Sequence, residues 1–469
     1  MASSRLPVPN STTSFWRSKP LSLDDHRTTA ELPKKADVVV IGSGYSGAST
    51  VYHMLKMYEE KGLPIPSVVI LEARQVCSGA TGRNGGHLKP DPYVRPAEIA
   101  VTHGYEAALE CANFERAHVP AVKKAIDEEG IDCDFVLTRC CDVLLTEDVA
   151  SKLRAGVNML RKAGLPTVVE DVYDGAAMDP KAAEQLSGVK GAKACFTYTA
   201  GHIFPYKFIH GLLNKCIDKY SVNLQTHTPV TVPIPAGPDP SDGRIPVTTA
   251  RGVIRAQRVI CATNAYTSSV LPEYSSRIVP VRGICSRIIP TNPATGPLQM
   301  SYIIRSSSTA YEYMIPRLDG SIIIGGARSE YLDKLDEWYD NVNDDALIPS
   351  VSNFFDGYMQ RHFKGWEESG ATTDRVWTGI MGYSSDNQPH VGPIPGRQNQ
   401  YIIAGFTGHG MPQIFLSAKG LADMIVNGSQ FKATGIPRLY QTTSDRITAT
   451  TNATLELWKS NMSDLKSRL

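Results

Sequence analysis

Residues 36–72 constrain the fold of this chain more than any other segment. An apolar run, Val38–Ile41, leads directly into Gly42, Gly44 and Gly47, which form a G-x-G-x-x-G pattern at an expected strand-to-helix junction. Gly42 permits a tight turn, Gly44 leaves room for a pyrophosphate beside the backbone, and Gly47 lets the helix pack closely on the strand. The N–H groups at a helix start are unpaired and carry partial positive charge, so they attract phosphates. The pattern predicts a dinucleotide-binding βαβ unit.

A second apolar run, residues 67–71, ends at Glu72, whose carboxylate is placed to accept hydrogen bonds from the hydroxyls of an adenosine ribose. Glu72 follows Gly47 by 25 residues, and the long turn at residues 60–67 accounts for this wide spacing. A glycine-rich turn without a ligand is the alternative interpretation. It is disfavoured because strand, glycines, helix, second strand and acid all occur in the expected order. The predicted cofactor-binding residues of this unit include Ser43, Tyr45 and Ser46.

The loop that follows Glu72 indicates which dinucleotide is bound. Nicotinamide-binding domains usually continue into another crossover helix here, whereas residues 78–90 read SGATGRNGGHLKP, a polar, glycine-rich stretch. Such a stretch suits a backbone that runs along a bound flavin, and a plain flexible loop is the alternative. The loop residues predicted to bind the cofactor are Ala73, Arg74, Ser78, Thr81, Gly82, Arg83, Asn84, Gly85 and Gly86.

Three stretches, GSGYSG, SGATGRNGGH and GFTGHGM, resemble the D-amino-acid-oxidase-like superfamily of FAD-dependent amine and amino-acid oxidoreductases. The resemblance spans roughly residues 36–430, and the sequence of the second stretch is similar to that of the gamma-glutamylputrescine oxidoreductase group and its fungal relatives. It implies an α/β (α+β) fold, with a discontinuous Rossmann-like FAD-binding domain and an interleaved antiparallel-sheet substrate domain. The expected divisions are an N-terminal arm at 1–35, FAD-binding segments at 36–95, 195–270 and 370–440, substrate segments at 96–194 and 271–369, and a C-terminal tail at 441–469.

The same resemblance implies further contacts with the cofactor. A buried strand ending in small residues, RVICATNAYT, is expected to return beside the flavin, and a Gly-His-Gly turn near residue 409 is expected to approach the pyrimidine side of its ring. The residues implied are Val230, Thr263, Asn264, Gly405, Gly408, Gly410 and Met411. In the N-terminal arm, Phe15 and Trp16 are expected to hold the chain against the surface of the protein.

Departures from the superfamily patterns are equally informative. Some members carry a carboxylate-binding arginine in a G-x-R-P segment, and here Met381 occupies its place. Others link the flavin through a cysteine near that position, or through a histidine that aligns with Arg83, and neither residue is present. Noncovalent FAD is therefore expected, with His87 as the alternative point of attachment. Because Met381 offers no donor, amines without an α-carboxylate are expected to be better substrates than D-amino acids or glycine.

Candidate substrate-pocket residues are His87, His202, Tyr206, Arg282, Tyr313, Met381 and His409. Each could instead be a packing or capping residue. His87 and His409 are favoured because both lie inside segments expected to face the flavin. Arg282 could bind an anionic group or pair with an acid at the domain junction.

Composition excludes several classes of function. The chain has 469 residues with 48 Lys plus Arg against 47 Asp plus Glu, so neither a nucleic-acid nor an anionic membrane surface is expected to be its partner. No apolar run approaches the length of about 18 residues that spans a bilayer. The N-terminus lacks the apolar core of a secretory signal. Nine scattered cysteines are typical of reduced thiols, and no Cys or His cluster indicates a metal.

The chain ends in Ser467-Arg468-Leu469, a conservative variant of the peroxisomal Ser-Lys-Leu signal. The sequence therefore predicts recognition by a peroxisomal import receptor, with the cytoplasm as the alternative location. The leading hypothesis is an FAD-dependent amine oxidase that uses molecular oxygen and yields an imine and hydrogen peroxide. A second is a tailoring oxidase or dehydrogenase that acts on an amino acid or a secondary-metabolite intermediate. A third is a flavin-binding protein without turnover.

Overall fold

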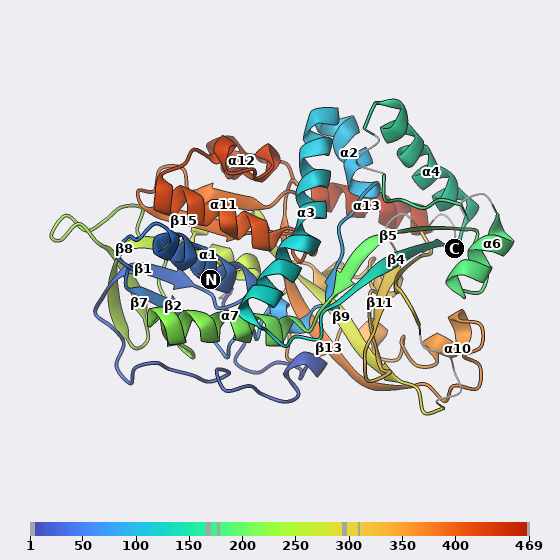
Figure 1. Cartoon of the computed structure of the whole chain (residues 1–469), viewed down its shortest axis with the longest axis horizontal. Coiled ribbons are helices and arrows are strands. Elements are labelled where there is room, and N and C mark those ends of the chain that lie inside the picture. Colours follow the sequence, from blue (N-terminus) through green and yellow to red (C-terminus); the bar gives the residue numbers. More distant parts are fainter. Residues whose placement is uncertain (1–4, 166–169, 176–178, 293–297, 308–309, 467–469) are drawn as a thin grey trace.

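The computed structural model describes residues 5–165, 170–175, 179–292, 298–307 and 310–466, with side chains to residue 460. The C-terminal tripeptide lies outside the described residues. The chain builds two sheets, which occupy the left and right halves of Figure 1. This architecture confirms the predicted α/β fold with two different sheets.

The first sheet has seven strands in the order β14-β15-β8-β1-β2-β6, with β7 paired to β8. β1 (Lys35–Ile41) pairs in parallel with both β2 (Val68–Leu71) and β8 (Gly252–Cys261), so the glycine-rich turn leaves the middle of the sheet. Its apolar run is buried throughout, as expected for a parallel strand covered on both faces. The other strands are β6 (Asn223–Gln225), β7 (Ile245–Thr249), β14 (His390–Pro393) and β15 (Gln400–Ala404).

Three helices pack together on one side of this sheet. α1 (Tyr45–Glu60) contacts both α7 (Pro205–Tyr220) and α11 (Ile414–Asn427), and all three lie in the left half of Figure 1. Aromatic rings fill the space between them, with Tyr45 and His53 against Phe415. This packing fixes the start of α1 relative to the turn that precedes α11.

The second sheet has eight strands in the order β13-β9-β12-β11-β10-β4-β5-β3. Its longest pairing joins β13 (Thr372–Ser384) to β9 (Ile278–Ile289) in antiparallel register. The others are β3 (His87–Leu88), β4 (Val136–Leu144), β5 (Ala194–His202), β10 (Ser301–Arg305), β11 (Tyr311–Pro316) and β12 (Ile322–Gly325). All its pairings are antiparallel except that of β10 with β4.

Three strands lie in the other sheet from the one predicted. The sequence-based division placed residues 87–88, 195–202 and 372–384 with the FAD-binding segments, whereas β3, β5 and β13 belong to the second sheet. Strands with buried apolar residues carry a similar signal in either sheet, so the pattern could not distinguish them. The precise domain boundaries stay predictions.

Helix α3 (Tyr105–Glu129) lies where the two halves of the molecule meet (Figure 1) and contacts α11. Gly104, with φ +86°, separates it from α2 (Val94–His103). The other α-helices among the described residues are α4 (Glu147–Lys162), α6 (Pro180–Ser187), α8 (Thr267–Val270), α9 (Leu335–Trp338), α10 (Tyr358–His362), α12 (Ser444–Thr448) and α13 (Ala453–Lys466). Among the described residues, no helix has both the length and the apolar character that a bilayer crossing requires.

The N-terminal arm lies on the protein, as predicted. Trp16 is completely buried, and its indole Nε1 donates to the Asn84 carbonyl at 2.6 Å. The Phe15 ring packs beside it, with centroids 5.2 Å apart. The two aromatic residues thus fix the arm against the loop that was predicted to face the flavin.

Candidate cofactor and substrate site

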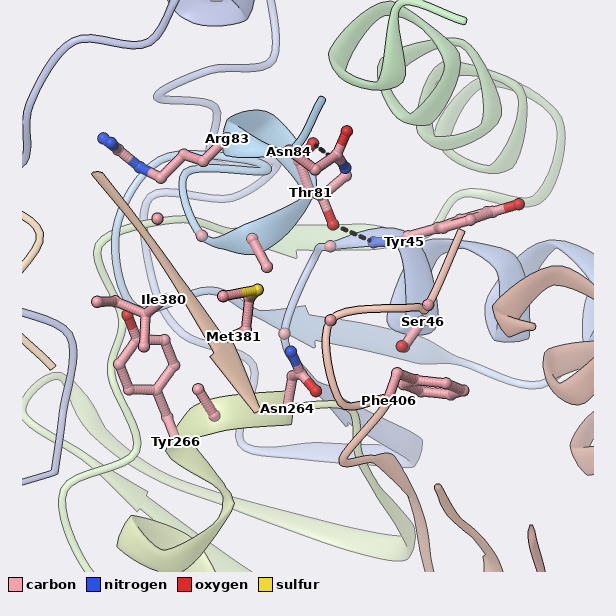
Figure 2. A pocket seen from close by; sticks show the side chains of 18 of the residues that line it. Tyr45, Ser46, Thr81, Arg83, Asn84, Asn264, Tyr266, Ile380, Met381 and Phe406 are labelled. Carbon is pink, nitrogen blue, oxygen red and sulfur yellow. Dashed lines mark hydrogen bonds between the residues drawn. The ribbon is translucent and has the colours of Figure 1, made fainter. Parts of the chain in front are cut away.

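One cavity of about 310 Å³ is lined by residues from both sheets. Figure 2 shows part of it, with Tyr45, Ser46 and Thr81 on one side and Met381 and Tyr266 on another. Of the residues predicted to bind the cofactor, those that line the cavity are Gly42, Gly44, Tyr45, Ser46, Glu72, Ala73, Arg74, Ser78, Thr81, Arg83, Asn84, Gly85, Val230, Thr263, Asn264, Gly408, Gly410 and Met411.

The glycines of the first turn are required by close contacts. Gly42 adopts φ +110°, and a Cβ there would lie 2.6 Å from the Ala262 carbonyl oxygen. A Cβ on Gly47 would collide with the carbonyl oxygen of Gly42, so Gly47 packs the helix against the turn without facing the cavity. A Cβ on Gly44 would approach Thr81 Oγ1 to 3.0 Å. The backbone therefore leaves an open cradle at the start of α1.

Charge and hydrogen bonding in this cradle suit a dinucleotide. The N-cap position of α1, Gly44, has no side chain to satisfy the first N–H groups of the helix. Tyr45 N–H bonds Thr81 Oγ1 at 2.9 Å. Glu72 accepts from the N–H and Oγ of Ser43 at 3.0 and 2.7 Å, which fixes its carboxylate at the cavity wall. Unpaired N–H groups at the start of α1 suit a pyrophosphate, and the adjacent Glu72 carboxylate suits the ribose joined to it.

The two arginines of the loop have a different role from the one predicted. Arg74 makes two hydrogen bonds of 2.9 Å to the buried carboxylate of Asp344, and Arg83 Nε lies 3.4 Å from the same group. Arg83 also donates to the carbonyls of Ser78 and Thr378, at 2.8 and 2.7 Å. Figure 2 shows its guanidinium directed away from Met381 and the middle of the cavity. Both arginines line the site but hold the loop in place instead of offering charge to a ligand.

Some predicted cofactor residues act from behind the cavity wall. Ser43 positions Glu72, and Gly82 and Gly86 admit the side chains of Arg17 and Trp16, which a Cβ would meet at 3.0 Å. Gly405 donates its N–H to Asn264 Oδ1 at 3.1 Å and so joins the two turns. The predicted residues that do not line the cavity are Ser43, Gly47, Gly82, Gly86 and Gly405.

At the second turn, His409 is tied to a buried acid that the sequence did not reveal. Its Nε2 bonds Glu115 Oε2 at 2.9 Å, and Gln413 Nε2 bonds the other oxygen at 2.7 Å. Burial alone would raise the pKa of Glu115, but the charge and hydrogen bond of His409, with Arg95, hold that pKa at about 2. His409 therefore lines the cavity in a fixed orientation.

Four of the seven candidate pocket residues line the cavity: His87, Tyr313, Met381 and His409. The rings of His87 and Tyr313 meet edge to face at 5.5 Å, and burial lowers the pKa of His87 well below its ordinary value. Tyr313 fits over Gly85 and Gly325, where a Cβ would come within 2.6 and 2.5 Å of its ring. Met381 lies beside Gly283 and Gly408. These residues form a largely uncharged wall.

The other three candidates lie outside the cavity, which corrects the prediction. Arg282 donates to the carbonyls of Glu337 and Ala346, at 2.8 and 2.6 Å. It precedes Gly283 on β9, and successive strand residues point to opposite faces, so Arg282 faces away from the site. His202 is buried at the end of β5, where burial lowers its pKa to about 4. Tyr206 bonds Asp24 at 2.8 Å and thereby holds the arm.

Two cations in the cavity wall, Lys89 and Arg328, were missed. Arg328 follows a turn in which Gly326 and Ala327 adopt φ +130° and +56°, and its Nη2 donates to Tyr383 OH at 2.9 Å. Lys89 is half-buried, and among the described residues it has no hydrogen-bonding or ion-pairing partner. For Arg328 the sequence signal was the glycine pair in GGAR, which is typical of many hairpin ends, and Lys89 stood unnoticed in the glycine-rich stretch at residues 78–90. Although Met381 cannot donate a hydrogen bond to a carboxylate, Lys89 and Arg328 in the same cavity wall can.

Among the described residues, no group of three or more His, Cys, Asp or Glu is arranged to hold a metal ion. A glycine-rich βαβ turn, a ribose-facing acid and a second sheet that closes the same cavity define a dinucleotide-dependent redox enzyme of two-sheet architecture. The chain belongs to the FAD dependent oxidoreductase family, whose model matches residues 37–424. FAD is therefore the cofactor, and the resemblance noted in the sequence is confirmed.

Similar proteins cover nearly the same span. Gamma-glutamylputrescine oxidoreductase from Escherichia coli is 25% identical over 83% of this chain and 83% of its own length. A probable oxidoreductase, OrdL, from Haemophilus influenzae is 24% identical over 86% and 87% of the two chains. Among solved structures, glycine oxidase from Geobacillus kaustophilus superposes with a TM-score of 0.66, at 19% identity over 85% of this chain and 96% of that one. The protein is thus an FAD-dependent oxidoreductase of a family that acts on amines or amino acids.

Proposed function

We propose that this protein is an oxidase that breaks a C–H bond next to nitrogen in an amine carrying a carboxylate, with molecular oxygen as the electron acceptor. The products are an imine and hydrogen peroxide. The observation that carries the proposal is the pair of cations, Lys89 and Arg328, in the wall of the cavity. It revises the expectation, drawn from Met381, that amines without an α-carboxylate would be preferred.

The charge balance of the cavity supports an anionic substrate group. Among the described lining residues the only acid is Glu72, which lies at the ribose end and is held by Ser43. Arg328 has a hydroxyl partner in Tyr383 but no ion pair with a described acid. Arg328 is half-buried, and a cation partly removed from water without a counter-ion is costly. Its planar guanidinium matches a carboxylate bidentately. A bound carboxylate would supply the missing partner.

The chain's own residues divide the chemistry between them. The start of α1 would hold the pyrophosphate of FAD, and Glu72 would hold its ribose. FAD, when bound, accepts the hydride equivalent of the substrate. Arg328 orients the carboxylate, while Tyr313 and Met381 exclude water from the reacting side. Nearby positive charge disfavours an ammonium group, so Lys89 and Arg328 keep the substrate nitrogen in the neutral form that oxidation requires.

Two relatives support a carboxylate-bearing substrate by the compounds in their names. Glycine and gamma-glutamylputrescine both combine an amine with a carboxylate, and proteins named for each are similar to this chain. The test is a peroxide assay of the purified flavoprotein across glycine, D-amino acids, N-substituted amino acids, gamma-glutamylputrescine and putrescine. Preference for putrescine over every carboxylate would contradict the proposal. Substrate-dependent flavin reduction without peroxide would instead favour a dehydrogenase or a tailoring enzyme of secondary metabolism.

We also propose that the protein works in peroxisomes, because its sequence ends in Ser-Arg-Leu. An oxidase that produces hydrogen peroxide is well placed in such a compartment. The cytoplasm is the alternative location, and the targeting experiment below distinguishes the two.

A further inference from the structure

Residues 5–17 form a strap that crosses the cofactor end of the cavity. Leu6 and Pro7 are themselves part of the cavity wall, together with Arg74 and Tyr266. The strap precedes residue 37, where the match to the family begins, so the family relationship assigns it no role. Its position raises the question of what it adds to the site.

Hydrogen bonds fasten the strap at both of its ends. Arg5 Nη1 donates to the Ser275 carbonyl at 2.5 Å, and Arg5 Nη2 pairs with Asp340 at 2.9 Å. Ser14 Oγ donates to the Gly82 carbonyl at 2.6 Å, next to the bond from Trp16 to Asn84. The strap therefore runs from the elements after β8 to the back of the loop that carries the cofactor contacts.

Between these ends the strap supplies acceptors to the two buried arginines. Val8 offers its carbonyl to Arg74 Nη1 at 3.0 Å, and Thr12 offers its carbonyl to Arg83 Nη2 at 2.5 Å. Ser11 also bonds Arg83, while Thr12 N–H donates to the Asp344 carbonyl at 2.7 Å. Without the strap, Arg83 Nη2 would lose both of its acceptors, and Arg74 Nη1 would keep only its bond to Asp344.

We infer that the strap is an additional part of the FAD site, which covers the cofactor through Leu6 and Pro7 and holds the loop at residues 78–86 through Arg74 and Arg83. The ligand class is the dinucleotide that the family already requires. FAD should therefore bind faster to a protein without the strap and leave it much faster, because both the cover and the loop's support are lost.

The experiment compares apoprotein forms titrated with FAD, with flavin fluorescence as the readout and no substrate present. Removal of residues 1–10 deletes the cover and leaves Trp16 as an anchor, and we expect the dissociation constant for FAD to rise about tenfold or more. Removal of residues 1–4 alone is the matched control and should leave the constant unchanged. Leu6→Gly with Pro7→Gly removes the cover but keeps the backbone acceptors, so it tests the cover if the longer deletion fails to fold.

Thermal unfolding separates a cofactor role from a general stabilising role. If the strap acts on the FAD site, the loss of melting temperature in the deletion should shrink as FAD is raised to saturation. An FAD dissociation constant within about twofold of the wild type, in the deletion or the double glycine variant, would overturn the inference. Because no substrate is used, this result is independent of whether the proposed amine oxidation is correct.

Discussion

Glu115, in the middle of α3, accepts a hydrogen bond from Nε2 of His409 at 2.9 Å, across 294 residues of sequence. The bond joins the helix at the junction of the two halves to the turn that precedes α11. Glu115 is 2% exposed and also accepts from Gln413 and from the backbone of Asp91. The carboxylate thus holds a cavity histidine without facing the cavity itself.

Replacement of Glu115 by Gln should change the acid stability of the protein. In the folded protein the pKa of Glu115 is about 2, below its ordinary value of 4.5, so its carboxylate stabilises the fold fully above pH 4.5. That contribution, about 3 kcal/mol, is lost as the pH falls toward 2. Denaturant unfolding at a series of pH values should therefore be less pH-dependent below 4.5 in Glu115→Gln. Glu60→Gln, at the exposed end of α1, should follow the wild type.

Gly44→Val should abolish FAD retention. The new side chain would meet Thr81 Oγ1 and fill the cradle that the pyrophosphate must enter. The variant should be isolated without yellow colour but with a circular dichroism spectrum like that of the wild type. Gly237→Val, placed where a Cβ meets nothing within 4 Å, should retain flavin. Stoichiometric FAD in Gly44→Val would show that the cofactor lies elsewhere.

The flavin should be released by acid precipitation, because no cysteine or histidine occupies the positions at which related enzymes attach it. His87 is the first candidate for a covalent link, and its edge-on contact with Tyr313 holds its ring in place, while a cysteine is the alternative, since Cys77 and Cys285 also line the cavity. We expect all yellow colour in the supernatant. Colour in the pellet that disappears in His87→Gln would replace the noncovalent prediction with a histidyl link.

Arg328→Met should raise the KM for a carboxylate substrate by about a hundredfold, because a buried carboxylate loses its charged partner. The KM of Arg328→Lys should lie between those of the wild type and Arg328→Met, because lysine keeps the charge but not the bidentate geometry. Tyr383→Phe removes the hydroxyl that accepts a hydrogen bond from Arg328, and it should raise the KM less than Arg328→Met does. Arg139→Met, at a partly exposed ion pair with Asp171 outside the cavity, is the matched control. Equal KM values in Arg328→Met and wild type would contradict the assignment of this residue.

Deletion of Ser467–Leu469 should move a tagged protein from peroxisomes to the cytosol with an unchanged flavin spectrum. A charge-preserving control, Ser467→Ala, should remain in peroxisomes because a small residue at that position is retained. A diffuse distribution of the full-length protein would remove the basis for the peroxisomal proposal.

The parts of the site that lie close together in sequence could be predicted. Gly42 to Gly47 and Glu72 belong to one βαβ unit, in which the order of residues along the chain largely determines where each one lies. The Gly-His-Gly turn was recognisable for the same reason, since a strand, a turn and a helix follow one another. Local motifs therefore gave the cofactor and the fold class.

The parts that depend on the pairing of distant strands could not be predicted. Arg282 was a candidate because arginine can bind a carboxylate. Successive residues of β9 point to opposite faces of the sheet, so Gly283 faces the cavity and Arg282 does not. Arg328 stands in a stretch with no motif and reaches the cavity only through the order of strands in the second sheet. Lys89 stands in the glycine-rich stretch at residues 78–90, but nothing in that pattern distinguishes it from a solvent-exposed lysine. Asp344 and Glu115 are buried acids whose partners lie hundreds of residues away.

The carboxylate of Asp344 binds Arg74 across 270 residues of chain. The backbone carbonyl of the same residue accepts a hydrogen bond from Thr12 N–H in the strap. During synthesis the strap and the glycine-rich turn leave the ribosome before Asp344, which lies 270 residues after Arg74. The βαβ unit can form early from its local contacts, but its cofactor loop has no fixed position until the second sheet has been completed. We therefore expect flavin capture to follow the synthesis of the second sheet, so a translation product that ends before β13 should not sequester FAD.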